Sequence, residues 1–415
     1  MPKPRYPSKI DPLSFPVFGL NWWSNPGTGD TVISYCGGGG SAKTGVINKI
    51  VFRSNDQPAV DISTGDDVCV QVVVWQDYKT NEIMLYGAIG SSIKRFALPS
   101  GQLTADIHVK ESGGTNVVAI NALGTFMAVG CESGDVHVFS IQDHIFTPMH
   151  VLQGHEKAVC SLSFALRSPL LLSSAKDGTA RVWFDDKIVD TMTCDVTDPK
   201  VPPPKKAPQV LVRGTAFGDL EGKLLYTVAS GRRGKAYLSK WVSNGTSYVC
   251  ETRTEVHPCP VSAMNLSGDA SLLALGGVDG TIVLFDVMTW KPIKTWAEVH
   301  ELPVTCIAAR PYPTPSKGEE DGMIYHAISA SADSQLAVLT LMRRGPSKKK
   351  EGGGKSSDNL PSLTLVFWFL VLFTMLRVIA QETMELCSMN MSMSCLMNEV
   401  LIAPTSRPGI MHPPH

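Results

Sequence analysis

A run of four glycines at residues 37–40 is the feature of this sequence best suited to binding chemistry. It lies in the segment 36–49, which reads Cys-Gly-Gly-Gly-Gly-Ser-Ala-Lys-Thr-Gly-Val-Ile-Asn-Lys. Glycine adopts positive φ at little steric cost, but a run of glycines loses much conformational entropy when it becomes ordered. Such a run is expected where backbone must come close to a phosphate, a metal ion or another protein.

Phosphate binding by a P-loop would require the pattern Gly-x-x-x-x-Gly-Lys-Thr. Counted from Gly37, Ala42 stands where the second glycine must be. A P-loop also leads into a helix whose N-terminus faces the phosphates. Residues 46–52 are largely β-branched and apolar and predict a strand instead, so the loop is predicted to join two strands. A nucleotide-binding enzyme and a plain flexible hairpin remain as alternatives.

The composition predicts a large folded domain without affinity for nucleic acid. The chain has 415 residues, 43% of them hydrophobic, and a net charge of −1. Nucleic-acid binding usually demands a basic face, so this charge gives no case for it. The first twelve residues lack the apolar region of a secretory signal. The ten cysteines show no Cys-x-x-Cys spacing. The eight between residues 36 and 306 are expected to be small, buried, reduced residues of a cytosolic domain, whereas Cys387 and Cys395 could pair in the tail.

Three segments, 118–139, 159–184 and 261–286, share a pattern of strand, turn, strand, Asp-Gly-type hairpin and strand. The hairpin positions recur 44, 56, 46 and 54 residues apart, at Gly134, Gly178, Gly234, Gly280 and Ser334. Such a period is typical of a β-propeller of the WD-repeat kind. Residues 17–341 would give seven blades of about 46 residues. We expect the first strand of the chain to close the last blade.

The repeat residues themselves predict structure and not catalysis. His155, Asp177 and Asp279 are expected to make hydrogen bonds within turns and between strands. The Pro-rich segment 200–208 is expected to be a loop between blades. No Ser-His-Asp order, HExxH motif or paired-carboxylate motif stands out in the sequence. Propellers commonly bind partners across their faces, so interaction is the expected function.

A membrane anchor is predicted near the C-terminus. Residues 360–380 would form a helix of roughly 31 Å, which is enough to cross a bilayer core, although a buried core helix is the alternative. Basic residues precede this segment and acidic residues follow it, which predicts a cytosolic N-terminal part. The predicted organisation is therefore a cytosolic propeller at 1–342, a basic Gly-rich linker at 343–359, a transmembrane helix at 360–380 and a short lumenal tail at 381–415.

The predicted propeller, its glycine run and its anchor together resemble a family of guanine-nucleotide exchange factors of the endoplasmic reticulum membrane. That family, which includes the animal prolactin regulatory element-binding protein, activates the small GTPase that starts COPII coat assembly. The motif that carries the resemblance is Gly37-Gly38-Gly39-Gly40, then Lys43-Thr44-Gly45, then Asn48-Lys49. Other family features are matched only in architecture.

The resemblance implies a function without covalent chemistry. In the family the loop of the first blade holds a potassium ion and projects against the GTPase. Backbone carbonyls of the loop glycines would bind the ion here, at Gly37, Gly38, Gly39, Gly40 and Gly45. Contacts to the GTPase would come from Lys43, Thr44 and Ile47. Asn48 matches the residue most needed for exchange, and His300 matches a second part of the contact surface.

The implied location is the endoplasmic reticulum membrane, with the propeller in the cytosol and the C-terminus in the lumen. The alternative function is a membrane-tethered propeller scaffold without exchange activity. The two hypotheses share fold and anchor, and they differ at the loop. Exchange should need Asn48 and potassium, whereas a scaffold should tolerate the loss of either.

Overall fold

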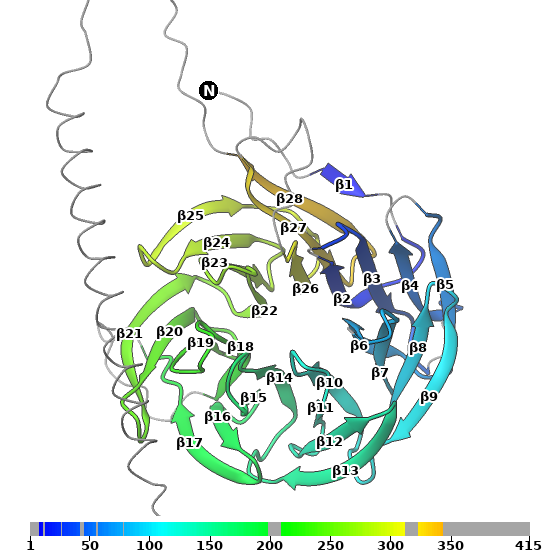
Figure 1. Ribbon diagram of the computed structural model, residues 1–415. Helices are drawn as coiled ribbons and strands as arrows, with labels where there is room; N and C mark the ends of the chain where they lie inside the picture. The colour runs from blue at the N-terminus through cyan, green and yellow to red at the C-terminus, as the bar shows by residue number, and fades with distance from the viewer. Residues whose placement is uncertain are drawn as a thin grey trace, which may run out of the picture. The chain divides into compact units, whose positions relative to one another are not determined.

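The computed structural model describes residues 8–10, 13–25, 27–41, 45–54, 57–77, 79–197, 209–311 and 323–342. These residues form seven four-stranded antiparallel sheets, which surround a central axis as the blades of a propeller (Figure 1). The all-β, seven-bladed propeller predicted from the spacing of the repeats is therefore confirmed.

In the first six blades the four strands run outward from the central axis in chain order, and in the seventh β1 is added outside β28 (Figure 1). The strands of the first four blades are β2 (Val17–Ser24), β3 (Thr31–Gly37), β4 (Asn48–Ser54) and β5 (Val60–Gly65); β6 (Cys69–Gln76), β7 (Ile83–Ile89), β8 (Ser92–Leu98) and β9 (Gln102–His108); β10 (Thr115–Ile120), β11 (Phe126–Cys131), β12 (Val136–Gln142) and β13 (Ile145–Leu152); and β14 (Val159–Phe164), β15 (Leu170–Ala175), β16 (Thr179–Phe184) and β17 (Lys187–Thr193). The strands of the last three blades are β18 (Val210–Phe217), β19 (Leu224–Gly231), β20 (Ala236–Ser243) and β21 (Tyr248–His257); β22 (Val261–Leu266), β23 (Leu272–Gly277), β24 (Ile282–Asp286) and β25 (Lys291–Trp296); and β26 (Val304–Ala309), β27 (Met323–Ser331), β28 (Leu336–Met342) and β1 (Ser8–Ile10).

The ring is closed by strands from opposite ends of the propeller sequence. β1 pairs antiparallel with β28, with Lys9 opposite Ala337, and becomes the outermost strand of the seventh blade. This confirms the prediction that the first strand closes the last blade. The Pro-rich segment 200–208, predicted to be a loop between blades, lies outside the described residues; in the chain it follows β17 of the fourth blade and precedes β18 of the fifth.

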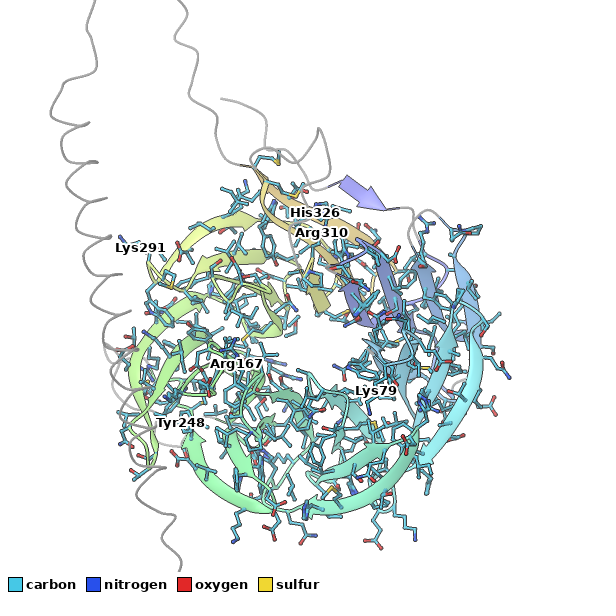
Figure 2. All side chains as sticks on the ribbon, viewed as in Figure 1. Lys79, Arg167, Tyr248, Lys291, Arg310 and His326 are labelled. Atoms are coloured by element: carbon cyan, nitrogen blue, oxygen red, sulfur yellow. The ribbon has the colours of Figure 1, made fainter. Side chains whose placement is uncertain are left out.

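The hydrophobic core is divided among the seven spaces between neighbouring blades. Alternation along each strand gives every sheet two apolar faces, and each face packs on the next blade. Each of the seven clusters of buried side chains combines residues from two adjacent blades. The cluster between the seventh and first blades contains Val17, Val51, Ile328 and Leu336. Figure 2 shows side chains occupying these spaces around the ring.

A buried polar network fixes the fourth blade. Trp183 Nε1 donates to Ser173 Oγ at 2.8 Å, Ser173 Oγ lies 2.8 Å from His155 Nε2, and His155 Nδ1 lies 3.0 Å from Asp177 Oδ2. Burial of Asp177 raises the pKa of its carboxyl, but hydrogen bonds from His155 and Thr179 outweigh this and hold the pKa well below its usual value. The carboxylate therefore stays ionised and orients the imidazole.

Hydrogen bonds of the same kind occur in the seventh and fifth blades. In the seventh blade, His300 Nδ1 lies 3.1 Å from Asp333 Oδ2 and its Nε2 lies 2.9 Å from Ser329 Oγ. In the fifth blade only the inner half remains, with Trp241 Nε1 donating to Thr227 Oγ1 at 3.0 Å. The expectation that His155 and Asp177 serve structural hydrogen bonds is confirmed.

The linker, transmembrane helix and tail predicted over 343–359, 360–380 and 381–415 lie outside the described residues. Among the residues that are described, no helix has the length and apolar character needed to cross a membrane.

The polar network of the fourth blade leads to a stability prediction. Ser173→Ala should lower the free energy of unfolding by about 2 kcal/mol, because it leaves a buried indole N–H and an imidazole nitrogen without a partner. Urea unfolding followed by tryptophan fluorescence measures the change. Ser163→Ala, on β14 of the same blade, is the control and should cost less than about 0.5 kcal/mol. Equal effects of the two substitutions would contradict the assigned role of Ser173.

Candidate functional site

The glycine run forms an enlarged hairpin between the second and third strands of the first blade. Residues 38–47 join β3 to β4, so the predicted connection between two strands is confirmed and a P-loop, which leads into a helix, is excluded. The other six blades close the corresponding hairpin with two to four residues. A short turn satisfies the sheet, so the extra residues of the first blade point to a role beyond closure of the hairpin.

Asn48, the first residue of β4, holds this loop against the neighbouring turn. Its Oδ1 accepts the N–H of Gly40 at 2.9 Å. Its Nδ2 donates toward three backbone carbonyls: Gly40 at 3.1 Å, Gly65 at 3.1 Å and Asp66 at 3.0 Å. The side chain is only 3% exposed. Asn48 therefore connects the glycine loop to the turn after β5 through buried hydrogen bonds.

The carbonyl arrangement around Asn48 also bears on cation binding. An amide group has two protons, whereas three carbonyl oxygens converge on Nδ2. Carbonyl oxygens are the ligands that replace the hydration shell of K⁺ in proteins. Carbonyl oxygen is therefore the right ligand type for K⁺, and Gly40 belongs to the predicted set, but these three carbonyls already accept from the Asn48 amide. Binding of a potassium ion stays a prediction.

Two of the glycines are required by the local backbone. Gly38 has φ of 146° and Gly40 has φ of 73°, conformations that other L-residues rarely adopt. A Cβ at Gly38 would also lie 2.2 Å from Asn48 Oδ1, which is far inside van der Waals contact. The close approach of this backbone to the Asn48 amide thus explains part of the glycine run.

The two side chains at the base of the loop that could act as nucleophiles, Cys36 and Lys49, are not activated. Burial raises the pKa of the Cys36 thiol well above its usual value, as does a hydrogen bond with Cys69, so the thiol stays neutral. Lys49 Nζ pairs with Asp61 Oδ2 at 2.6 Å and lies 5.1 Å above the ring of Phe15. These contacts favour a site that binds a partner over one that supplies a nucleophile.

The seventh blade lies next to the loop through the segment before β2. Gly38 N donates to the Pro16 carbonyl at 3.1 Å, and Leu13 N donates to the Ser334 carbonyl at 2.8 Å. Ser334 follows Asp333, which binds His300. The structure therefore connects the loop to the hairpin of the seventh blade, and it places Asn48 and His300 on adjacent blades without a direct contact between them.

The predicted site residues differ in accessibility. Ile47 is 68% exposed, whereas His300 is 4% exposed and fully engaged with Asp333 and Ser329. Gly37 and Gly38 are buried, Gly39 and Gly40 are partly buried, and Gly45 is exposed. Lys43 and Thr44 lie outside the described residues. Of the predicted contact residues that are described, Ile47 presents a side chain to solvent, and Asn48 and His300 have internal partners.

Sequence reasoning missed the residues that hold Asn48. The carbonyls of Gly65 and Asp66 contribute through the backbone, which leaves no side-chain signature. The one available signal was the polar turn Ser-Thr-Gly-Asp-Asp at 63–67, which is typical of a tight connection between strands.

The sequence pattern of the family described as "WD domain, G-beta repeat" matches residues 146–183 and 248–286. Each match covers the outer strand of one blade and three strands of the next, β13–β16 and β21–β24. The chain therefore contains WD repeats within a seven-bladed propeller.

Curated relatives match parts of the chain. The Periodic tryptophan protein 2 homolog of Neurospora crassa is 30% identical over 190 residues, 43% of this chain and 20% of that protein. Striatin-4 of Homo sapiens is 26% identical over 203 residues, 47% of this chain and 26% of that protein. SEC12-like protein 2 of Arabidopsis thaliana is 23% identical over 245 residues, 57% of this chain and 54% of that protein. The chain thus spans between a fifth and about half the length of these relatives.

Among solved structures, the crystal structure of the WD40 beta propeller domain of Doa1 superposes with a TM-score of 0.57. The sequence identity is 12%, and the match covers 80% of this chain and 95% of the other. At this identity the likeness concerns the fold alone.

The buried position of Asn48 predicts a cost when its side chain is removed. Asn48→Ala should lower the free energy of unfolding by about 2 kcal/mol, because several buried backbone groups lose their partner. Asn48→Asp should cost more, since a carboxylate cannot donate to the three carbonyls. Urea unfolding and amide exchange of the loop measure both effects. Ile47→Ala, on an exposed side chain, should stay within about 0.5 kcal/mol of the wild type, and a larger loss there than at Asn48 would refute the assignment.

Proposed function

We propose that this chain is a guanine-nucleotide exchange factor for the small GTPase that starts COPII coat assembly at the endoplasmic reticulum membrane. The observation that carries the proposal is the enlarged glycine hairpin of the first blade, held by Asn48 where the other blades have short turns. The loop motif and the partial match to SEC12-like protein 2 support it. The anchor predicted at 360–380 would keep the propeller at the membrane.

The physical task of an exchange factor is differential binding. It must bind the nucleotide-free GTPase more tightly than the GDP-bound form, and that difference is the driving force for release. A rigid loop performs this task better than a flexible one, because less conformational entropy is lost on binding. The hydrogen bonds of the Asn48 amide to the glycine loop and to the turn after β5 supply such rigidity before the partner arrives.

In this proposal the residues divide into positioning and contact roles. Asn48 positions the loop from inside, and His300 positions the hairpin of the seventh blade through Asp333. Direct contact comes from exposed side chains at the same end of the propeller, including Ile47 at 68% and Leu302 at 46% exposure. A potassium ion bound by the loop carbonyls would add further rigidity to the glycine backbone.

A membrane-tethered propeller scaffold is the second candidate. The observation that favours it is that Asn48 and His300 both have complete internal partners, as structural residues do. A scaffold would bind its partners without regard to bound nucleotide and would not change the rate of GDP release.

The proposal is tested by GDP release from the COPII-initiating GTPase in the presence of the full-length chain. Wild-type chain should accelerate release in K⁺ buffer and less in Na⁺ buffer. Ile47→Asp should reduce the acceleration at least tenfold, about 1.4 kcal/mol, because it places a charge in the apolar contact without disturbing the fold. Fluorescence of a labelled GDP gives the rates.

The matched control is Leu123→Asp. Leu123 is 77% exposed and lies in the turn between β10 and β11. Successive hairpins of a meander alternate between the two ends of a sheet, so this turn lies on the propeller face opposite the glycine loop. Its exchange activity should equal that of the wild type. Binding of the GTPase without acceleration by the wild-type chain would favour the scaffold and reject the exchange function.

A further inference from the structure

A cluster of three metal-binding side-chain types lies where the fifth blade meets the sixth, away from the glycine loop. His257 ends β21, Cys259 lies in the connection to β22, and Asp279 lies in the hairpin between β23 and β24. One ligand atom from each residue lies within 4.8 Å of the others. The imidazole is buried, the thiol is half-buried and the carboxylate is exposed, so the cluster opens to solvent on one side.

The fourth and seventh blades show what this position normally does. The sequences His155-Glu-Lys-Ala-Val, His300-Glu-Leu-Pro-Val and His257-Pro-Cys-Pro-Val occupy the same place before the innermost strand. In the first two, histidine Nε2 lies 2.8 Å and 2.9 Å from a serine, and Nδ1 faces an aspartate. Those histidines belong to closed structural networks.

The sixth blade departs from this network at the serine position. Leu275 stands where Ser173 and Ser329 hold the other imidazoles, so His257 has no inner hydroxyl to bind. Its ring faces the other way. Nε2 now points to Asp279, at 3.7 Å from Oδ2, and Nδ1 faces the backbone of Cys259.

Two further residues around His257 differ from their counterparts in the fourth and seventh blades. One leaves space beside the imidazole, and the other supplies a third ligand atom. Gly277 replaces Ala175 and Ser331, and a Cβ there would lie 2.4 Å from Asp279 Oδ1 and 3.3 Å from His257 Nε2. Cys259 replaces Lys157 and Leu302, which adds a thiol beside the imidazole. The loss of the serine, the missing Cβ and the added thiol all change the same small region.

We propose that His257, Cys259 and Asp279 bind a zinc ion. Nitrogen, sulfur and carboxylate oxygen are the ligand types of zinc, whereas Ca²⁺ and Mg²⁺ take oxygen. Two nitrogen or oxygen ligands of a tetrahedral zinc lie about 3.3–3.6 Å apart, given bonds of about 2.0–2.2 Å. The 3.7 Å between Nε2 and Oδ2 is longer than an N–H···O hydrogen bond and close to this separation.

The outer partners of the ligands fit zinc binding through Nε2 and Oδ2. His257 Nδ1 lies 3.3 Å from the Cys259 carbonyl, which can accept its proton and fix the tautomer that frees Nε2. The Cys259 N–H also lies 3.2 Å from Nδ1 and would lose this contact in that tautomer. Asp279 Oδ1 accepts the Thr281 N–H at 3.2 Å, which leaves Oδ2 for the metal. A fourth position remains for water.

The ion would fasten two blades together. His257 belongs to the outermost strand of the fifth blade, and Asp279 to a hairpin of the sixth. A metal bound to the folded state alone adds its binding free energy to stability. The proposal is independent of the exchange function, because its ligands lie on other blades than the glycine loop.

Cobalt(II) and zinc titrations of the purified, chelator-treated full-length chain test the proposal. The wild type should show a near-ultraviolet thiolate-to-cobalt absorption band, which zinc abolishes, and zinc should raise Tm by a few degrees. Cys259→Ser should lose the band, and Asp279→Asn should weaken zinc binding at least tenfold. Gly277→Ala should weaken it as well, because its methyl group fills the space between the ligands.

The matched control is Cys250→Ser, which removes an exposed thiol from β21 of the same region. The chain has ten cysteines, so other thiols could also bind cobalt. The proposal is therefore tested by the difference in cobalt absorption between Cys259→Ser and Cys250→Ser, and not by the total amount of metal bound. Equal cobalt bands in these two variants would overturn the proposal. The absence of a zinc-induced Tm shift in the wild type would overturn it too.

Discussion

The structure depends on the burial of apolar sheet faces between neighbouring blades. A single four-stranded meander cannot cover both of its own faces, so each blade is stable only when it has a neighbour on either side. A ring satisfies this condition for every blade at once, provided that its last space is closed. Here that space is filled by residues of the first and seventh blades, and the pairing of β1 with β28 ties both ends of the propeller sequence together.

This closure also determines where the candidate site lies. The segment that leads from β1 into β2 crosses the junction between the two blades, and its backbone binds both the glycine loop and the turn at Ser334. The enlarged hairpin is therefore supported from two sides, by Asn48 within its own blade and by Pro16 from the junction. The described first part of this loop, residues 38–41, is thereby held by contacts that an isolated sheet would not supply.

The repeat architecture could be predicted from sequence because the hairpin position, glycine in four blades and Ser334 in the seventh, recurs at intervals of about one blade. Gly134, Gly178 and Gly280 all have positive φ, so the residue type follows from the backbone that the turn requires. The strand after the glycine run was predictable for a similar reason, since Ile50, Val51 and Phe52 have strand character. Its predicted start at residue 46 was two residues early, because Val46 and Ile47 belong to the enlarged loop and β4 begins at Asn48. The contact of Asn48 with the turn after β5 could not be predicted, because it is made with the backbone carbonyls of Gly65 and Asp66, which only folding brings close. The cluster where the fifth blade meets the sixth was missed because its ligands do not follow paired zinc spacing and Asp279 is distant in sequence.

The blades also show where new chemistry can arise in a propeller. Packing between blades provides most of the stability, so the polar network of any one blade can change without loss of the ring. The fourth and seventh blades keep the network of histidine, aspartate and serine, and the fifth keeps its inner half. The first blade has the glycine loop as the hairpin between its second and third strands. The sixth blade has Leu275 where the fourth has Ser173, and Cys259 precedes this blade where Lys157 precedes the fourth. In these two blades the hairpin therefore departs from the network that the fourth and seventh blades share. Since the hairpins between second and third strands all lie at one end of the ring, the departures lie on the same face of the propeller. That face is therefore the part of the molecule where partner binding and metal binding can be acquired while the core between the blades stays unchanged.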